Sequence, residues 1–163
     1  MFIVAGAPAH SSFKKAQLLT RLSSISSVQT FDSQWVYLFD QALDEQQHQS
    51  ALQLLNDGTS FELRQVANDE LQVLVTPRIG TISPWSSKAT DIFKNCNTPV
   101  HRLERGILYT LKGVSELSNE VKQALHDRMT ETVFSQIEDA HRLFLETPPK
   151  PLNSIDILSL IHI

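Results

Sequence analysis

The 163-residue sequence has the length of one compact domain, with 41% apolar and 20% charged residues. Its formal net charge of −4 gives no electrostatic support for general nucleic-acid binding. No apolar run approaches the roughly 20 residues that a membrane-spanning helix needs. The single cysteine, Cys96, allows no internal disulfide and fits a reducing compartment. The composition therefore predicts a cytoplasmic domain that binds neither nucleic acid nor membrane.

The first half of the chain predicts a strand, a helix, a two-stranded hairpin and a second helix. Its best helix start is Asp44, because Gln47 stands at the capping-box position. Apolar spacing gives the elements in chain order as a strand over 2–5, a helix from Ser11 or Ser12 to about Ile25, strands over 28–31 and 35–39 that turn at 32–34, and a helix over 45–55.

The second half predicts the same kinds of element. Ser83 is a strong N-cap, because Pro84 can take the first helical position without losing a hydrogen bond. The elements are strands over 61–66 and 71–76, a helix over 84–96, strands over 100–103 and 107–111 that turn near 104–106, a helix after Ser118, and a helical stretch over about 133–145.

This order of elements indicates an internal repeat, with units over about 1–70 and 71–135. Trp35 in the first unit corresponds to Ile107 in the second, at an offset of 72 residues. One such unit is too small to bury its own apolar side, whereas two units can share a core. The sequence therefore predicts an α+β pseudo-dimer of two strand–helix–hairpin–helix units, with antiparallel sheets and helices packed on one face.

The domain boundary is predicted near the end of the chain. The repeats and the helical stretch over 133–145 place one domain over residues 1–147. The segment Thr147–Pro151 contains three prolines and has the composition of a linker. Residues 148–163 are therefore expected to lie outside the folded domain.

Catalytic and cofactor motifs are missing from the sequence. Gly80 precedes a helix start with hydroxyls and Lys88, but a phosphate-binding loop of the Walker type needs glycine, not Ser87, before the lysine. Capping explains these hydroxyls more simply. The six histidines are scattered without metal-ligand spacing. No catalytic residue, cofactor site or metal site is expected in this chain.

The helix after Ser83 has an apolar stripe and a polar stripe. The predicted inner stripe consists of Trp85, Ala89, Ile92, Phe93 and Cys96. Trp85 stands in the first turn, where either a core position or a partner-facing rim would suit it. Packing does not explain the polar residues of the other side.

The segment Thr76–Ile92, with the sequence TPRIGTISPWSSKATDI, resembles the N-terminal region of large-type formylglycinamide ribonucleotide amidotransferases (phosphoribosylformylglycinamidine synthases). Two further family-like segments follow in the expected order, HRLERG at 101–106 and HDRMTE at 126–131. The resemblance covers about residues 1–157. At 153–158 the chain resembles the entry to the family's linker domain, and residues 159–163 depart from the pattern as a truncated end would.

The resemblance implies that this part of the enzyme carries no catalytic site. In the family, the N-terminal domain resembles a dimer of a separate small subunit, and a linker, a synthetase domain and a glutaminase domain follow it. Ammonia from glutamine attacks ATP-activated formylglycinamide ribonucleotide to give the formylglycinamidine product of purine biosynthesis. The sites for ATP, magnesium and the catalytic cysteine lie in the later domains.

The leading hypothesis is a structural and interface domain whose partners are the synthetase and glutaminase domains of the same polypeptide. An alternative is a free-standing regulatory or binding module with a small anionic ligand at the Ser83 helix start. An independent enzyme is disfavoured, because no catalytic constellation is present. The residues expected at the interdomain surface are Arg78, Ser83, Trp85, Ser86, Ser87, Lys88, Asp91, Arg102 and Arg105.

Overall fold

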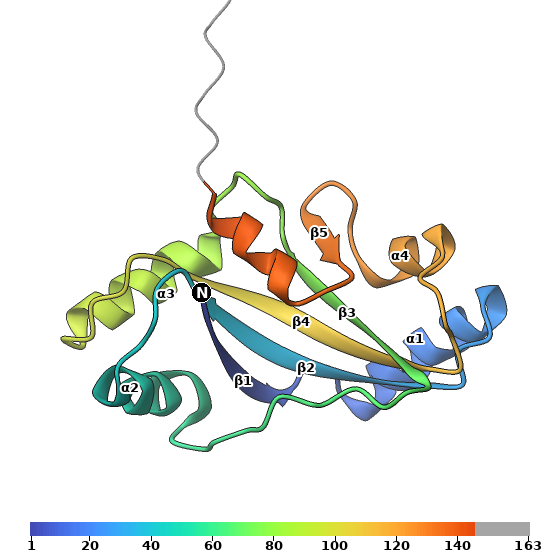
Figure 1. The fold of residues 1–163 in the computed structure, drawn as a ribbon, viewed down its shortest axis with the longest axis horizontal. Helices are drawn as coiled ribbons and strands as arrows, with labels where there is room; N and C mark the ends of the chain where they lie inside the picture. The colour runs from blue at the N-terminus through green and yellow to red at the C-terminus, as the bar shows by residue number, and fades with distance from the viewer. Residues whose placement is uncertain (146–163) are drawn as a thin grey trace, which may run out of the picture.

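Five strands form one antiparallel sheet in the order β1-β2-β4-β3-β5, in a computed structural model that describes residues 1–145 (Figure 1). The strands are β1 (Phe2–Pro8), β2 (Thr30–Phe39), β3 (Glu70–Pro77), β4 (Leu103–Lys112) and β5 (Glu131–Phe134). The helices are α1 (Ser12–Ile25), α2 (Glu45–Asn56), α3 (Pro84–Asn95), α4 (Asn119–Leu125) and the 3₁₀ helix η1 (Glu138–Phe144). The predicted α+β class with antiparallel pairing is confirmed.

Each of the two predicted hairpins is instead one long strand. β2 runs through 32–34 and β4 runs through 104–106, because these strands pair with each other from Thr30 opposite Lys112 to Phe39 opposite Leu103. The polar residues that suggested turns are side chains of an alternating strand. Gly106 serves a close approach of backbones, since a Cβ atom there would lie 2.8 Å from the carbonyl oxygen of Val75.

The predicted strand over 61–66 is wrong as well. This segment, which we call the strap, crosses the sheet as irregular backbone. Side-chain amides take the place of a strand ladder: Gln34 Nε2 donates to the Glu62 carbonyl at 3.0 Å, and Gln72 Nε2 donates to the Arg64 carbonyl at 2.6 Å. Leu63 packs against a cluster of buried apolar residues on one face of the sheet, so the strap buries apolar surface without pairing as a strand.

The predicted helix over 133–145 is replaced by two different elements. Residues Glu131–Phe134 form β5, in which Val133 lies opposite Val75 of β3. A 3₁₀ helix follows, and its Ala140 and Leu143 are fully buried. The predicted linker over 148–163 lies outside the described residues.

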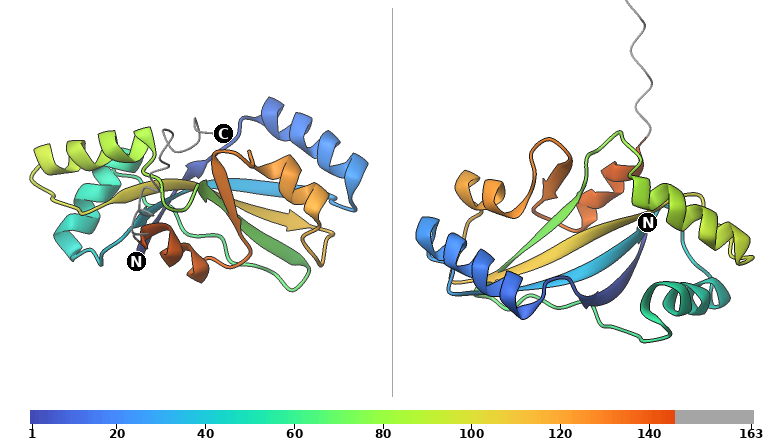
Figure 2. Two further views of the ribbon diagram at one scale, coloured as in Figure 1. Left: turned by 90° about the horizontal axis from the view of Figure 1, so that it is seen from above. Right: turned by 180° about the vertical axis from the view of Figure 1, so that it is seen from behind.

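The alternation of side chains separates two faces of the sheet. One face, the helix face, packs against α1 and α4 near one end and against α2 and α3 near the other. The opposite face packs against η1 and the strap. Figure 2 (left) shows α1 and α3 on one side of the sheet and η1 on the other. The prediction that the α-helices share one face therefore agrees with the structure.

The arrangement supports the predicted repeat, although the superposition of the two units stays a prediction. The order strand–helix–strand–helix occurs twice before β5. Trp35 lies directly opposite Ile107 in the β2–β4 register, at the offset of 72 that the sequence suggests. Each helix pair on the helix face also combines one helix from each unit, as exchange across a two-fold axis would produce.

Helix α3 is rotated slightly from its predicted orientation. Ala89 and Phe93 are buried as predicted, but Ile92 is 51% exposed and Cys96 is exposed. The buried positions are Ser86, Ala89, Thr90 and Phe93, which keep the three- and four-residue spacing from Ser86 rather than from Trp85. Small hydroxyl side chains fit this interface, so apolar character alone misplaced the stripe.

Two adjacent residues of α3 provide a test of this orientation. Phe93→Ala should lower the free energy of unfolding by about 3–5 kcal/mol, because the ring is 1% exposed and leaves a cavity. Ile92→Ala is the matched control and should cost about 0.5 kcal/mol or less. Urea unfolding followed by circular dichroism measures both. Equal losses would show that α3 is oriented differently.

Candidate functional site

Ser83 begins α3 as predicted. Its hydroxyl oxygen accepts the backbone N–H of Ser86 at 3.0 Å, and Pro84 takes the first helical position. The same hydroxyl donates to Oε2 of Glu104 at 2.7 Å, and the Ser83 backbone N–H donates to Oε1 at 3.2 Å. The start of α3 is therefore anchored to strand β4.

Glu104 is fully buried, and Arg102 is its ionic partner. Arg102 Nη2 lies 2.7 Å from Glu104 Oε1 and also donates to the carbonyl oxygen of Thr81 at 2.7 Å. Arg102 Nη1 donates to the carbonyl oxygen of Leu143 at 3.2 Å. This pair joins the loop before α3, strand β4 and helix η1. No local sequence signal indicated this pair, because the residues at 104–106 resemble a turn.

This arrangement argues against a small anionic ligand at the Ser83 helix start. The N-terminus of a helix attracts anions through its free N–H groups and its dipole. Here the carboxylate of Glu104 already receives the donors of Ser83, so the chain supplies its own anion.

The predicted interface residues divide into three groups. Ser87, Lys88, Asp91 and Arg78 are exposed, and Trp85 and Arg105 are partly buried beside one another. Ser86 is fully buried, so its side chain faces the core and not a partner. Ser83 and Arg102 are engaged inside the domain as described above. The structure therefore leaves six of the nine residues at the surface, and Arg102 belongs to the opposite face.

Arg105 lies between two indole rings on the helix face. Its Cζ atom is 4.3 Å from the centre of the Trp35 ring and 5.0 Å from that of the Trp85 ring. The Trp85 ring stacks on Tyr37, with centroids 5.9 Å apart and an interplanar angle of 23°. Cation–π attraction therefore fixes the guanidinium in one place. No sequence signal joined these residues, because they come from three separate elements.

The stack lies on the helix face, where α3 and α1 cover opposite ends of the sheet (Figure 2, right). A cavity of about 200 Å³ beside Trp85 and Arg105 also contacts Ile107 and Glu131. A second cavity of about 470 Å³ contacts Ile107 and Glu131 too, so the two cavities are adjacent along β4, and we call them together the groove.

The second cavity is lined by titratable side chains. They include His10, Lys14, Arg21, Tyr109 and Glu131. Burial, with Lys14 nearby, lowers the pKa of His10, and burial, with Glu131 nearby, raises the pKa of Tyr109. At neutral pH His10 and Tyr109 are therefore uncharged, and the fixed positive charges are those of Lys14 and Arg21.

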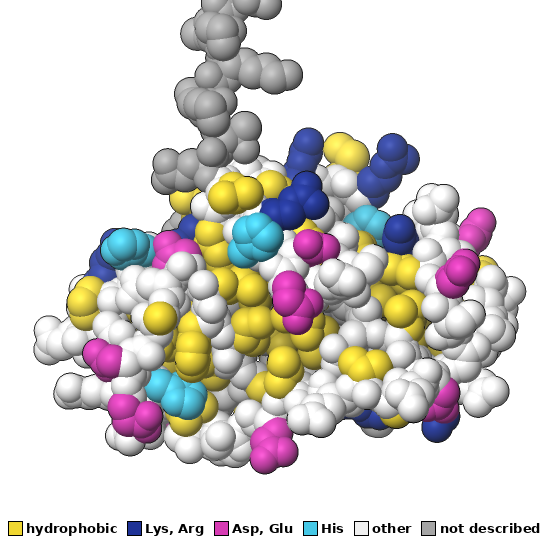
Figure 3. Space-filling view, viewed as in Figure 1, with side chains coloured by type: hydrophobic (Ala, Val, Ile, Leu, Met, Phe, Trp, Pro, Cys, Tyr) yellow, Lys and Arg dark blue, Asp and Glu magenta, His cyan; other side chains and the backbone are white. Residues whose placement is uncertain are grey.

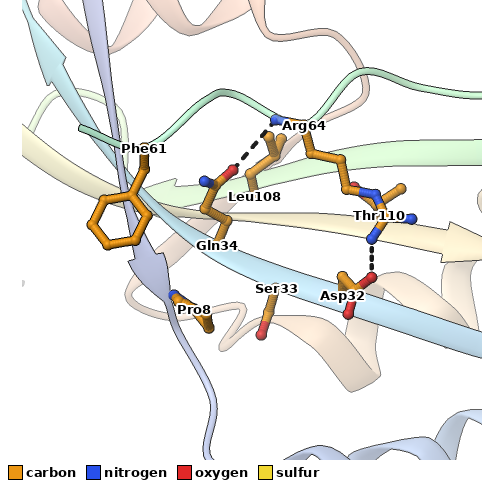
Figure 4. A pocket seen from close by; sticks show the side chains of 8 residues that line it. All are labelled: Pro8, Asp32, Ser33, Gln34, Phe61, Arg64, Leu108 and Thr110. Atoms are coloured by element: carbon orange, nitrogen blue, oxygen red, sulfur yellow. Dashed lines mark hydrogen bonds and ion pairs between the residues drawn. The ribbon is translucent and has the colours of Figure 1, made fainter. Parts of the chain in front are cut away.

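A different pocket, of about 280 Å³, lies on the opposite face under the strap. Figure 3 shows hydrophobic side chains gathered across the middle of this face. In Figure 4, Phe61 and Arg64 of the strap lie beside Gln34 and Leu108, and Arg64 pairs with Asp32. The lining is mostly apolar and contains no catalytic combination of acid, base and nucleophile.

Within residues 1–145, no group of three or more His, Cys, Asp or Glu side chains could hold a metal ion. In the same part of the chain, none of the helices has the length and apolar character to span a membrane.

Removing Arg102 should destabilise the domain strongly. Arg102→Ala leaves the buried Glu104 carboxylate without its ionic partner, and we expect a loss of about 3–5 kcal/mol in the free energy of unfolding. Glu104→Gln in the Arg102→Ala background should recover part of this loss, because a neutral amide costs less to bury. Arg78→Ala, which removes an exposed arginine, is the control. A loss as small as that of the control would contradict the structural role of the pair.

The comparison with known families agrees with these features. A family model described as "Formylglycinamide ribonucleotide amidotransferase N-terminal" matches residues 34–144, from within β2 to the end of η1. The matched region contains the Arg102–Glu104 pair, the Arg105 stack and the whole of α3. This chain therefore belongs to the N-terminal domain family of the formylglycinamide ribonucleotide amidotransferases of purine biosynthesis.

Proposed function

We propose that this chain is a non-catalytic domain that positions the synthetase and glutaminase domains of a formylglycinamide ribonucleotide amidotransferase. The family match over residues 34–144 carries the proposal. The parent enzyme would transfer ammonia from glutamine to formylglycinamide ribonucleotide with ATP. ATP, magnesium and the glutaminase cysteine would be held by other domains, while this chain would keep those domains in the geometry that transfer requires.

The structure refines the surface that would contact the other domains. The exposed side of α3 carries Ser87, Lys88 and Asp91, and Arg78 lies exposed in the loop before it. Within residues 1–145, the side chains of Lys88, Asp91 and Arg78 make no hydrogen bond or ion pair, and the Ser87 hydroxyl makes only a 3.5 Å hydrogen bond to the Ser83 carbonyl, whereas Ser83, Ser86 and Arg102 are used in packing. The first group is therefore the better candidate for interdomain contacts. The chain's single cysteine fits a cytosolic setting for such an enzyme.

The proposal predicts a coupling defect in a full-length polypeptide that carries this chain ahead of its linker, synthetase and glutaminase domains. Lys88→Ala should raise the ratio of glutamate formed to formylglycinamidine ribonucleotide formed, because misaligned domains lose ammonia to water. Added ammonium should restore product formation, since the synthetase site itself is intact. Loss of one partner from a desolvated pair costs about 2–5 kcal/mol, which is enough to shift the domains.

Lys94→Ala is the matched control for this experiment. Lys94 is exposed on the same helix but points in another direction, since six residues of an α-helix span about 600°. Its ratio should equal that of the wild type. If Lys88→Ala also gives the wild-type ratio at wild-type stability, this side of α3 is ordinary solvated surface.

A further inference from the structure

We propose that the groove along β4 on the helix face docks an extended acidic polypeptide segment, and that Arg105 binds a carboxylate of that segment between Trp35 and Trp85. The location of the segment in a neighbouring domain rests on the function proposed above. The carboxylate chemistry rests on the geometry of the groove.

Arg105 has free hydrogen-bonding capacity in a fixed position. Among the described residues, no hydrogen bond or ion pair involves its guanidinium, although two indole rings lie within 5.0 Å of its Cζ atom. Arg102, three residues earlier, makes four hydrogen bonds through its guanidinium. The stacking leaves the N–H groups at the edge of the Arg105 plane available, and such an edge binds a planar carboxylate through two parallel hydrogen bonds.

Contacts within the domain hold the side chains around Arg105 in place without a partner. Trp85 is fixed by the first turn of α3 and by its stacking on Tyr37. Arg105 itself lies opposite Tyr37 in the β2–β4 ladder. A partner carboxylate would therefore find the guanidinium already oriented, so binding would lose little side-chain entropy.

The charge of the groove selects an acidic partner. Its floor follows Arg105, Ile107 and Tyr109, which span about 13 Å of strand and match a partner of about four extended residues. Lys14 and Arg21 line its far end. Glu131 is the one carboxylate in the lining, and its Oε2 already accepts the Asp127 backbone N–H at 2.8 Å. The groove thus offers three fixed positive charges against one negative charge.

The same features disfavour a phosphate as the occupant. Phosphate sites usually employ several backbone N–H groups at a helix start, and the start of α3 is occupied by Glu104. The planar, forked guanidinium of Arg105 also matches a planar carboxylate through two parallel hydrogen bonds.

Trp35 and Trp85 are the two tryptophans of the chain, so tryptophan fluorescence reports on this groove alone. The 163-residue chain is titrated with an N-acetylated, C-amidated tetraglutamate peptide at constant ionic strength. We expect a saturable change in emission and weaker binding as salt rises. Tetraglutamine peptide and inorganic phosphate are the comparison probes, and both should bind more weakly than tetraglutamate.

Arg105→Gln should raise the dissociation constant for tetraglutamate about tenfold or more, because charge-assisted hydrogen bonds are lost. Arg105→Lys should also weaken binding, since an ammonium lacks the planar fork. Arg142→Gln makes the same charge change at an exposed position of η1, on the opposite face of the sheet, and should leave binding unchanged. Thermal unfolding of each variant verifies that the fold is kept. Lys14→Gln, on the exposed side of α1, gives an independent arm and should weaken binding several-fold.

The proposal is overturned by any of three results: no saturable signal with tetraglutamate, equal binding of tetraglutamine, or tighter binding of phosphate. Equal effects of Arg105→Gln and Arg142→Gln would overturn it as well. None of these results alters the glutamate-to-product ratio of the Lys88 experiment, so the two proposals fail separately.

Discussion

The buried carboxylate of Glu104 joins more separate segments of this domain than any other group described above. It receives the hydroxyl and backbone N–H of Ser83 on one side and the guanidinium of Arg102 on the other. A buried carboxylate without partners would cost several kcal/mol, so each partner is held firmly in place. Through Arg102 the constraint continues to the carbonyl oxygens of Thr81 and Leu143. One charge near the beginning of β4 thus fixes the start of α3 and the position of η1.

The same contact also explains why two nearby arginines differ: Arg102 is bound within the domain, whereas the guanidinium of Arg105 is available to a partner. Side chains of β4 alternate between the faces of the sheet, so Glu104 lies toward η1 while Arg105 lies toward α3. The ion pair on one face anchors the start of α3 through Ser83. Trp85, in the first turn of α3, then lies beside Arg105 on the other face. The buried pair is therefore a precondition for the groove, although it contributes no atom to it.

Local signals in the sequence were sufficient for the helix starts and insufficient for the sheet. Ser83 and Asp44 cap their helices as predicted, because a cap depends on residues within one turn. The polar residues at 32–34 imitate a turn, yet they continue a strand because β4 offers a partner along its whole length. The strap has the composition of a strand, but side-chain amides of Gln34 and Gln72 hold it over the sheet instead of beside an edge strand. Propensity yields to tertiary pairing in each case.

For the candidate site too, local sequence signals were sufficient and long-range contacts could not be predicted. Lys88 and Asp91 were placed correctly on the exposed side of α3, since helical spacing determines that side. The stack of Trp35, Arg105 and Trp85 could not be predicted, because it joins residues that are 20 to 70 positions apart. Only the register of β2 against β4 brings the first two together, and that register was hidden by the hairpin interpretation.

The predicted repeat, with its offset of 72 residues, would give Arg105 a counterpart at Ser33. In a dimer of two identical subunits, an arginine at one of these positions would require an arginine at the other. The two ends of the groove would then carry the same side chains. A single chain with two diverged halves has no such requirement. Its groove has an aromatic, guanidinium-bearing end and a lysine-bearing end, so it has a direction. A segment lying in it would have to run one way, a polarity that a groove between two identical subunits could not impose.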